Sequence, residues 1–169
     1  MVRFFLTDIA MQQNCQEYLR ALSGATQSGL PANTSIVVVG CGDPALIDFY
    51  ATESQCAFPI YADPSRKLYE DLGLVTSMAL GERPAYLQKS MVRLVGGSIM
   101  QGLRHLTSGL ATKGGDSRQN GGEFLFEGST GGEKEVTWCH RMTNTRDHAG
   151  IPELMQILGQ GETGSEHRQ

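Results

Sequence analysis

Apolar positions along this chain follow two patterns: unbroken β-branched runs, and stripes with helical spacing. The run SIVVVGCG at residues 35–42 predicts a strand buried on both faces of a parallel sheet. VRFFL at residues 2–6 and FPIYAD at residues 58–63 are predicted as further strands. GGEFLFEG at 121–128 and EVTWCHRM at 135–142 flank a loop rich in Gly, Ser and Thr, and therefore predict an antiparallel hairpin.

Segments with a helical period lie between these strands. The first carries one apolar stripe and is predicted to end at Ser23–Gly24; its members are Met11, Cys15, Tyr18, Leu19 and Leu22. Asp43–Pro44 and Asp63–Pro64 each combine an N-cap with a proline at the first helical position, and predict two more helices. Residues 83–107 are predicted as a helix that covers the sheet, and residues 151–159 as the last helix, with Gly159 as its stop.

This order of elements predicts an α/β fold. Parallel strands joined by helices, followed by a hairpin and a last helix, correspond to a thioredoxin-like three-layer architecture with a central mixed sheet flanked by helices. One domain is expected over residues 1–159, followed by a flexible polar tail at residues 160–169.

Composition and charge exclude several classes of protein. Of the 169 residues, 40% are apolar and 19% charged, a globular balance that argues against wholesale disorder. The net charge of −4, with scattered basic residues, gives no footprint for nucleic acid. The sequence shows no secretory signal and no apolar run long enough for a bilayer, so we expect a cytoplasmic protein without a membrane partner.

The four cysteines lie at positions 15, 41, 56 and 139, where no pair has Cys-x-x-Cys or zinc-ribbon spacing. In the cytoplasm they are expected to be free thiols. We therefore expect neither a metal nor a cofactor.

Several blocks of sequence resemble a known family. In chain order they are NCQEYLRAL, VVVGCGDPALIDFY, FPIYADPSRKLYEDLGL, QNGGEFLFE and VTWCHRMTNTRDHAGIPELM. They resemble the peroxiredoxin-like proteins of the AhpC/TSA antioxidant group, of the kind common in fungi. The resemblance implies a thioredoxin-like fold and thiol redox chemistry on a peroxide or a small-molecule thiol or disulfide. Members begin with a further segment, so the N-terminal strand region is expected to be truncated here.

The family pattern at the first helix is Cys-x-x-Cys followed by Gln-Glu-Tyr. This chain reads QQNCQEY over residues 12–18, so Gln12 stands where the first cysteine is expected and Cys15 matches the second, resolving-type cysteine. An amide forms neither a disulfide nor a sulfenate. The resemblance therefore predicts a degenerate site that cannot carry out two-cysteine chemistry within its own motif.

Two interpretations of Cys15 remain open. Thr7 or Asp8 is a better N-cap than any nearer residue, which would put Cys15 about 10 Å inside the helix, beyond the reach of the helix dipole. In that apolar stripe Cys15 is a small buried hydrophobe. In the second interpretation Cys15 is the catalytic nucleophile, and Arg146 or Arg141 stabilises its thiolate.

The other candidates carry alternatives as well. Cys41 follows a strand, and either fits a tight turn or forms a bridge to Cys15. Cys139 and His140 are neighbours on a strand, point to opposite faces and therefore form no dyad. The segment HRMTNTRDH at 140–148 either supplies a cation to the site or caps the last helix through Thr145 or Asp147.

The leading hypothesis is a peroxiredoxin-like thiol oxidoreductase of the antioxidant type, with a degenerate site and the capacity to form homo-oligomers. The alternative is a non-catalytic thioredoxin-fold domain for binding or scaffolding, serving a small-molecule pathway.

Overall fold

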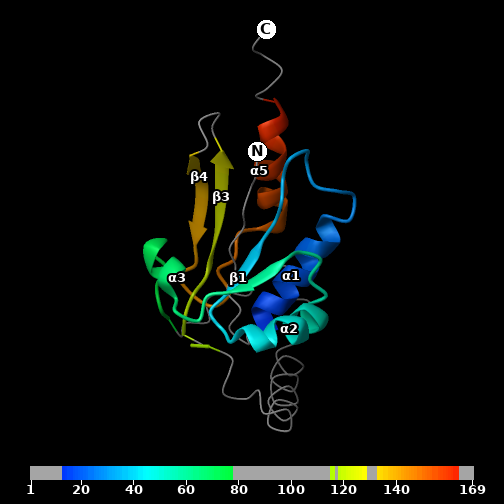
Figure 1. Ribbon diagram of the computed structural model, residues 1–169. Coiled ribbons are helices and arrows are strands. Elements are labelled where there is room, and N and C mark those ends of the chain that lie inside the picture. The colour runs from blue at the N-terminus through cyan, green and yellow to red at the C-terminus, as the bar shows by residue number, and fades with distance from the viewer. Residues whose placement is uncertain (1–12, 78–114, 117, 129–132, 164–169) are drawn as a thin grey trace.

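The computed structural model describes residues 13–77, 115–116, 118–128 and 133–163 (Figure 1). Its elements follow the order α1 (Gln13–Ala25), β1 (Val38–Gly40), the 3-10 turn η1 (Pro44–Leu46), α2 (Ile47–Ser54), β2 (Ile60–Ala62), α3 (Lys67–Asp71), β3 (Gly122–Gly128), β4 (Lys134–Arg141) and α5 (Ile151–Thr163). The strand predicted at residues 2–6 and the helix predicted at 83–107 lie outside the described residues. Among the helices that the structure describes, none has the length and apolar character that a bilayer-spanning segment requires.

The strands form one parallel pair and one hairpin. β1 runs parallel to β2, with Val38 opposite Ile60. β3 and β4 are antiparallel, with Phe124 opposite Cys139 and an irregularity between Leu125 and Phe126. The predicted α/β class and the hairpin are therefore confirmed. Within the described residues the strands make two two-stranded sheets, and the single central mixed sheet that we expected stays a prediction.

Buried side chains join α1 to the rest of the molecule. One cluster packs α1 against the hairpin and α5, which stand side by side in Figure 1; it consists of Tyr18, Leu22, Ile36, Leu125, Leu154 and Leu158. A second cluster, formed by Leu19, Val38 and Tyr50, packs the other side of α1 against β1 and α2. Because α1 is covered on two sides, the stripe predicted for it is core wherever the structure describes it.

Polar contacts fix α1 against α2. Arg20 of α1 binds Glu17 at 2.7 Å and donates from Nε to the side-chain oxygen of Gln55, just after α2, at 3.2 Å. The hydroxyl of Ser23 accepts a hydrogen bond from the backbone N–H of Ala57 at 3.1 Å. The position of α1 is thus set by directional bonds as well as by packing.

The two Asp-Pro signals have different outcomes. Asp43 accepts a hydrogen bond from Ala45 N at 2.8 Å and Pro44 follows, so that cap is confirmed, with a 3-10 first turn. Asp63, by contrast, accepts from Leu68 N at 2.9 Å and from the Ser65 hydroxyl. These bonds hold the intervening residues in a turn, with Arg66 at a φ of 60°, so α3 begins only at Lys67.

The last helix is longer than predicted. α5 continues to Thr163, so Gly159 does not end it, and the helix crosses the boundary that we predicted between domain and tail. Gly159 is absent from the glycines with positive φ, the left-handed backbone that a glycine stop requires. Glycine within a helix costs only about 1 kcal/mol relative to alanine, which the packing of Leu154 and Leu158 offsets.

Candidate functional site

Cys15 lies inside the protein. Cys15 is 1% exposed, on a helix in which Tyr18 and Leu19 are 0% exposed. The interpretation of Cys15 as a small buried residue therefore has the support of its burial. The proposed caps Thr7 and Asp8 lie outside the described residues, and so the depth of Cys15 within its helix stays a prediction.

Tyr18, one helical turn after Cys15, contacts a buried polar group formed by His148 and Glu123. The ring of Tyr18 stacks on the ring of His148 with centroids 4.2 Å apart and 7° between the planes. Nδ1 of His148 is hydrogen-bonded to Oε1 of Glu123 at 2.8 Å, and Ala149 N donates to Oε2 at 3.3 Å. The side chains of His148 and Glu123 are 0% exposed. These contacts tie α1 to β3 and to the loop between β4 and α5.

Sequence reasoning missed this group. The sequence pattern places His148 among the charges of the segment 140–148, and no motif singles out Glu123. The available signal was a carboxylate next to Phe124, within a strand whose first half is buried throughout. Carboxylates are almost never fully buried unless they are paired, so a Glu in such a strand predicts a buried partner.

Arg146 lies, half-buried, in the loop between β4 and α5. Asn144 accepts a hydrogen bond from Arg146 N at 3.0 Å, and Asp147 accepts from Thr143 N at 2.8 Å. Burial raises the pKa of Asp147, but the bonds from Thr143 and the nearby His140 together outweigh burial and leave that pKa below its usual value. Asp147 therefore stabilises the turn before it; α5 begins only at Ile151, and the cap by Thr145 or Asp147 stays a prediction.

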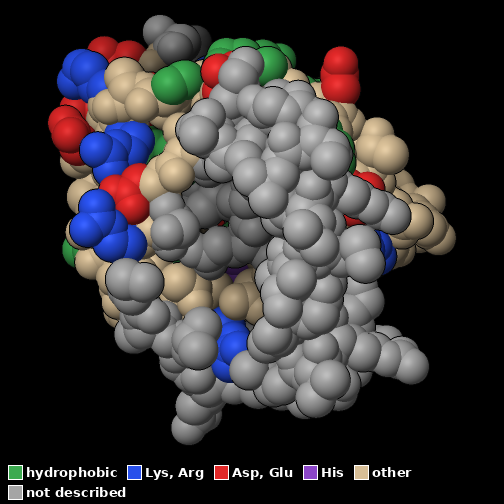
Figure 2. Space-filling model, turned by 90° about the horizontal axis from the view of Figure 1, so that it is seen from below, with side chains coloured by type: hydrophobic (Ala, Val, Ile, Leu, Met, Phe, Trp, Pro, Cys, Tyr) green, Lys and Arg blue, Asp and Glu red, His purple; other side chains and the backbone are tan. Residues whose placement is uncertain are grey.

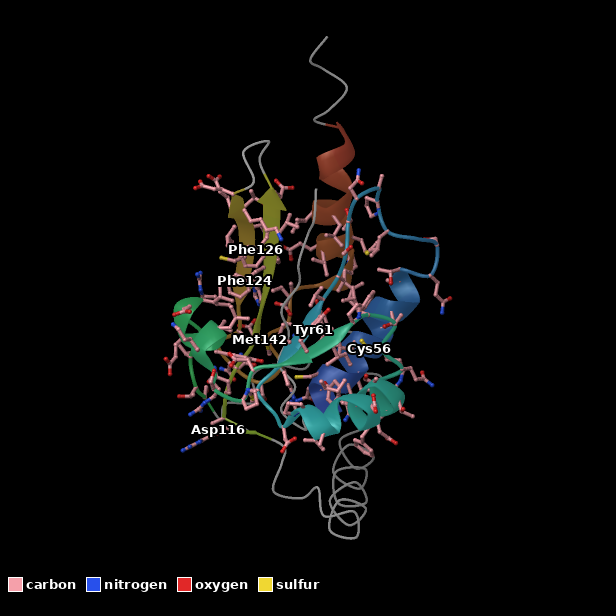
Figure 3. All side chains as sticks on the ribbon, in the orientation of Figure 1. Cys56, Tyr61, Asp116, Phe124, Phe126 and Met142 are labelled. Atoms are coloured by element: carbon pink, nitrogen blue, oxygen red, sulfur yellow. The ribbon has the colours of Figure 1, made fainter. Side chains whose placement is uncertain are left out.

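Arg141 is placed beside a different sulfur from the one expected. Its Nη1 lies 3.2 Å from Sγ of Cys139, and its Nε donates to the backbone oxygen of Leu72 at 2.7 Å. Its guanidinium carbon also lies 5.4 Å from the ring centre of Phe124, on the hairpin in Figure 3. The assignment of Cys15, Arg146 and Arg141 to one catalytic group stays a prediction.

None of the four cysteines forms a disulfide. Cys41 is 4% exposed and packs against Gly115: a Cβ there would lie 2.9 Å from the oxygen and 3.0 Å from the sulfur of Cys41. The tight-turn interpretation of Cys41 therefore has support, and the alternative bridge to Cys15 is absent.

A small hollow at this end of β1 and β2 is lined by Gly40, Gly42, Asp43, Leu46, Ile47 and Ala62. No group of three metal-ligating side chains occurs within the described ranges.

The segment after Gly115 is held by an ion-paired group. Asp116 accepts from Arg118 Nε at 3.1 Å and from Arg66 Nη1 at 3.1 Å. In Figure 2, basic and acidic side chains lie next to each other along one edge of the molecule. The side-chain and backbone hydrogen bonds from Arg118 lower the pKa of Asp116 to about 2.

This depressed pKa predicts a pH dependence of stability. The contribution of Asp116 is present above its usual pKa of 3.8 and is lost as the pH falls through the folded value of about 2. Between these pH values the wild-type chain should therefore lose stability more steeply than Asp116→Asn. Urea unfolding of both proteins across this range measures the difference, and equal slopes would contradict the prediction.

Comparison with known proteins identifies the family. The AhpC/TSA antioxidant enzyme family matches residues 19–144. Peroxiredoxin-like 2C of Homo sapiens is 30% identical over 162 residues, which is 94% of this chain and 66% of the relative. Peroxiredoxin-like 2C of Bos taurus is also 30% identical, over 94% of this chain and 65% of the relative, and the Mus musculus protein is 27% identical. The chain thus spans just under two thirds of the length of these relatives.

The matched segment contains Cys139 and Arg141, whereas Cys15 lies before it and Arg146 after it. The fungal type of the resemblance stays a prediction. The match covers most of the chain and agrees with the α/β architecture, so membership carries the thioredoxin-like fold of the family with it. The chain belongs to the AhpC/TSA antioxidant enzyme family and is similar to its peroxiredoxin-like 2C members.

Proposed function

We propose that this chain is a peroxiredoxin-like thiol oxidoreductase with a degenerate Cys-x-x-Cys site. Cys15 is the remaining thiol of the motif, and Gln12 stands in the place of its partner. The observation that carries the proposal is the position of Cys15, on a helix that resembles the first helix of the family and packs against β1, β3 and α5. The scaffold that positions the thiol is therefore intact, although the second thiol is missing.

The chemistry of one thiol is limited. A Cys15 thiolate attacks a hydroperoxide, the O–O bond breaks, the sulfur becomes a sulfenic acid and the alkoxide takes a proton from water. Gln12 has no sulfur to condense with that sulfenic acid, so an external thiol must reduce it. Because Cys15 is 1% exposed, the reaction also requires the structure to open, and turnover is slow. Arg146 is the candidate cation beside the thiolate.

One observation favours a second candidate function. Cys15 is as buried as the aliphatic residues of its helix, which is typical of a cysteine with a packing role only. In that case the chain is a non-catalytic domain for binding or scaffolding, and the scaffold serves recognition alone.

Restoration of the motif tests the proposed function. Gln12→Cys recreates Cys-x-x-Cys and is expected to raise peroxide consumption, with a dithiol as donor, by at least about tenfold, because the first cysteine of such a pair carries the lowered pKa. Mass spectrometry should then find a disulfide between residues 12 and 15.

The matched control is Gln12→Cys combined with Cys15→Ser, which keeps the new thiol but removes its partner. Cys139→Ser serves as the background in every sample, so that the signal comes from the motif. The proposal fails if the Gln12→Cys variant and the Cys15→Ser variant each consume peroxide at the rate of the Cys139→Ser background alone. The second candidate, a non-catalytic binding domain, then takes its place.

A further inference from the structure

One thiol of this chain outside the α1 motif, that of Cys139, has a cation beside it. Sγ of Cys139 lies 3.2 Å from Nη1 of Arg141, two residues further along β4. Residues two apart on a strand point to the same face, so the sulfur and the guanidinium share one side of the hairpin. Cys139 is half-buried against Phe124 and keeps access to solvent.

The guanidinium is held at this place by contacts that do not involve the sulfur. Its Nε donates to the backbone oxygen of Leu72 at 2.7 Å, and its central carbon lies over the ring of Phe124, a residue that is 0% exposed. A hydrogen bond and a cation–π contact therefore keep the charge in position before any thiolate forms. Such a pre-positioned arginine is the environment in which thiols become reactive.

Of the other three thiols, two are buried and the third is hydrogen-bonded to the backbone. Cys15 and Cys41 are 1% and 4% exposed. Cys56, which lies between α2 and β2 and is labelled in Figure 3, donates to the backbone oxygen of Phe58 at 3.6 Å, and burial raises the pKa of its thiol. Within the part of the chain that the structure describes, accessibility and a fixed cation coincide at Cys139.

We propose that Cys139 is a redox-modification site, at which hydroperoxides oxidise a thiolate that Arg141 stabilises. The thiolate attacks the outer peroxide oxygen, the O–O bond breaks, and the electron pair leaves on the alkoxide, which takes a proton from water. The sulfenic acid at Cys139 then condenses with a small-molecule thiol to give a mixed disulfide and water. This site is independent of the motif on α1.

Dimedone trapping measures the proposal directly. The protein is treated with less than one equivalent of hydrogen peroxide and dimedone, and adducts are quantified by peptide mass spectrometry. Trypsin separates the two thiols, since Cys15 falls in residues 4–20 and Cys139 in residues 135–141, or in residues 135–146 of Arg141→Gln, where the cleavage site after residue 141 is lost. The adduct at Cys139 is expected to exceed that at Cys15 by at least about tenfold, and Arg141→Gln to reduce it about tenfold.

Two further variants guard against an indirect effect. Arg141→Lys keeps a positive charge near the sulfur and should retain the Cys139 adduct within about threefold of wild type. Arg118, whose side chain binds Asp116, provides the control: Arg118→Gln also removes one positive charge and should leave the Cys139 adduct unchanged. An unlabelled Cys139, or equal labelling in Arg141→Gln and wild type, overturns the proposal. If the Cys139 adduct persists in Cys15→Ser, the Cys139 proposal stands even when the proposed function of Cys15 fails.

Discussion

Replacement of Glu123 by alanine is expected to lower the free energy of unfolding by about 3–5 kcal/mol, because it breaks a fully buried pair. The variant leaves Nδ1 of His148 and the N–H of Ala149 without their shared acceptor. It also loosens the stack between His148 and Tyr18, and with it the attachment of α1 to the hairpin. Urea unfolding, followed by circular dichroism, measures the loss as a lower midpoint at unchanged slope.

Two variants calibrate this result. Glu135→Ala removes a carboxylate from an exposed position of β4 and is expected to change stability by less than about 0.5 kcal/mol. Glu123→Gln keeps an acceptor at the buried position and should lose only about 1–2 kcal/mol. A Glu123→Ala chain as stable as Glu135→Ala would show that the buried pair does not hold α1 in place.

Much of the fold could be predicted because local patterns and burial agree. The β-branched run ending at Gly40, the Asp43–Pro44 cap and the two strands of the hairpin each specify an element without help from distant residues. The predictions failed for two reasons. At the start of α3, Asp63 formed hydrogen bonds with Ser65 and Leu68 and produced a turn. At the end of α5, the helix continued through Gly159 because its buried leucines outweigh the propensity of a single glycine.

The site was harder to predict than the fold. The stripe on α1 indicated that Cys15 is buried, because helical spacing alone places it with Tyr18 and Leu22. The partners of Glu123 and Arg141 depend on which strand faces which loop. Arg141 reaches the oxygen of Leu72, far away in sequence, and no local pattern carries that information. Its contact with Cys139 could have been suspected from their spacing along one strand.

The burial of Cys15 has a second large expected effect, on its reactivity. A neutral alkylating reagent reaches a buried sulfur only when the surrounding structure opens, and an opening free energy of about 3 kcal/mol slows the reaction by roughly a hundredfold. Cys15 in the folded chain should therefore react at least about a hundredfold more slowly than in the urea-unfolded chain. Cys139, which is half-buried, should be slowed far less and provides the comparison within each sample.

Pulsed iodoacetamide labelling of the folded and unfolded chain, with quantification of the peptide of residues 4–20, tests most directly whether the motif thiol is shut inside the core. We expect protection of a hundredfold or more at Cys15, lost only as the whole chain unfolds. Labelling of Cys15 in the folded chain at the rate of the unfolded one would contradict the account and return this sulfur to an open active site.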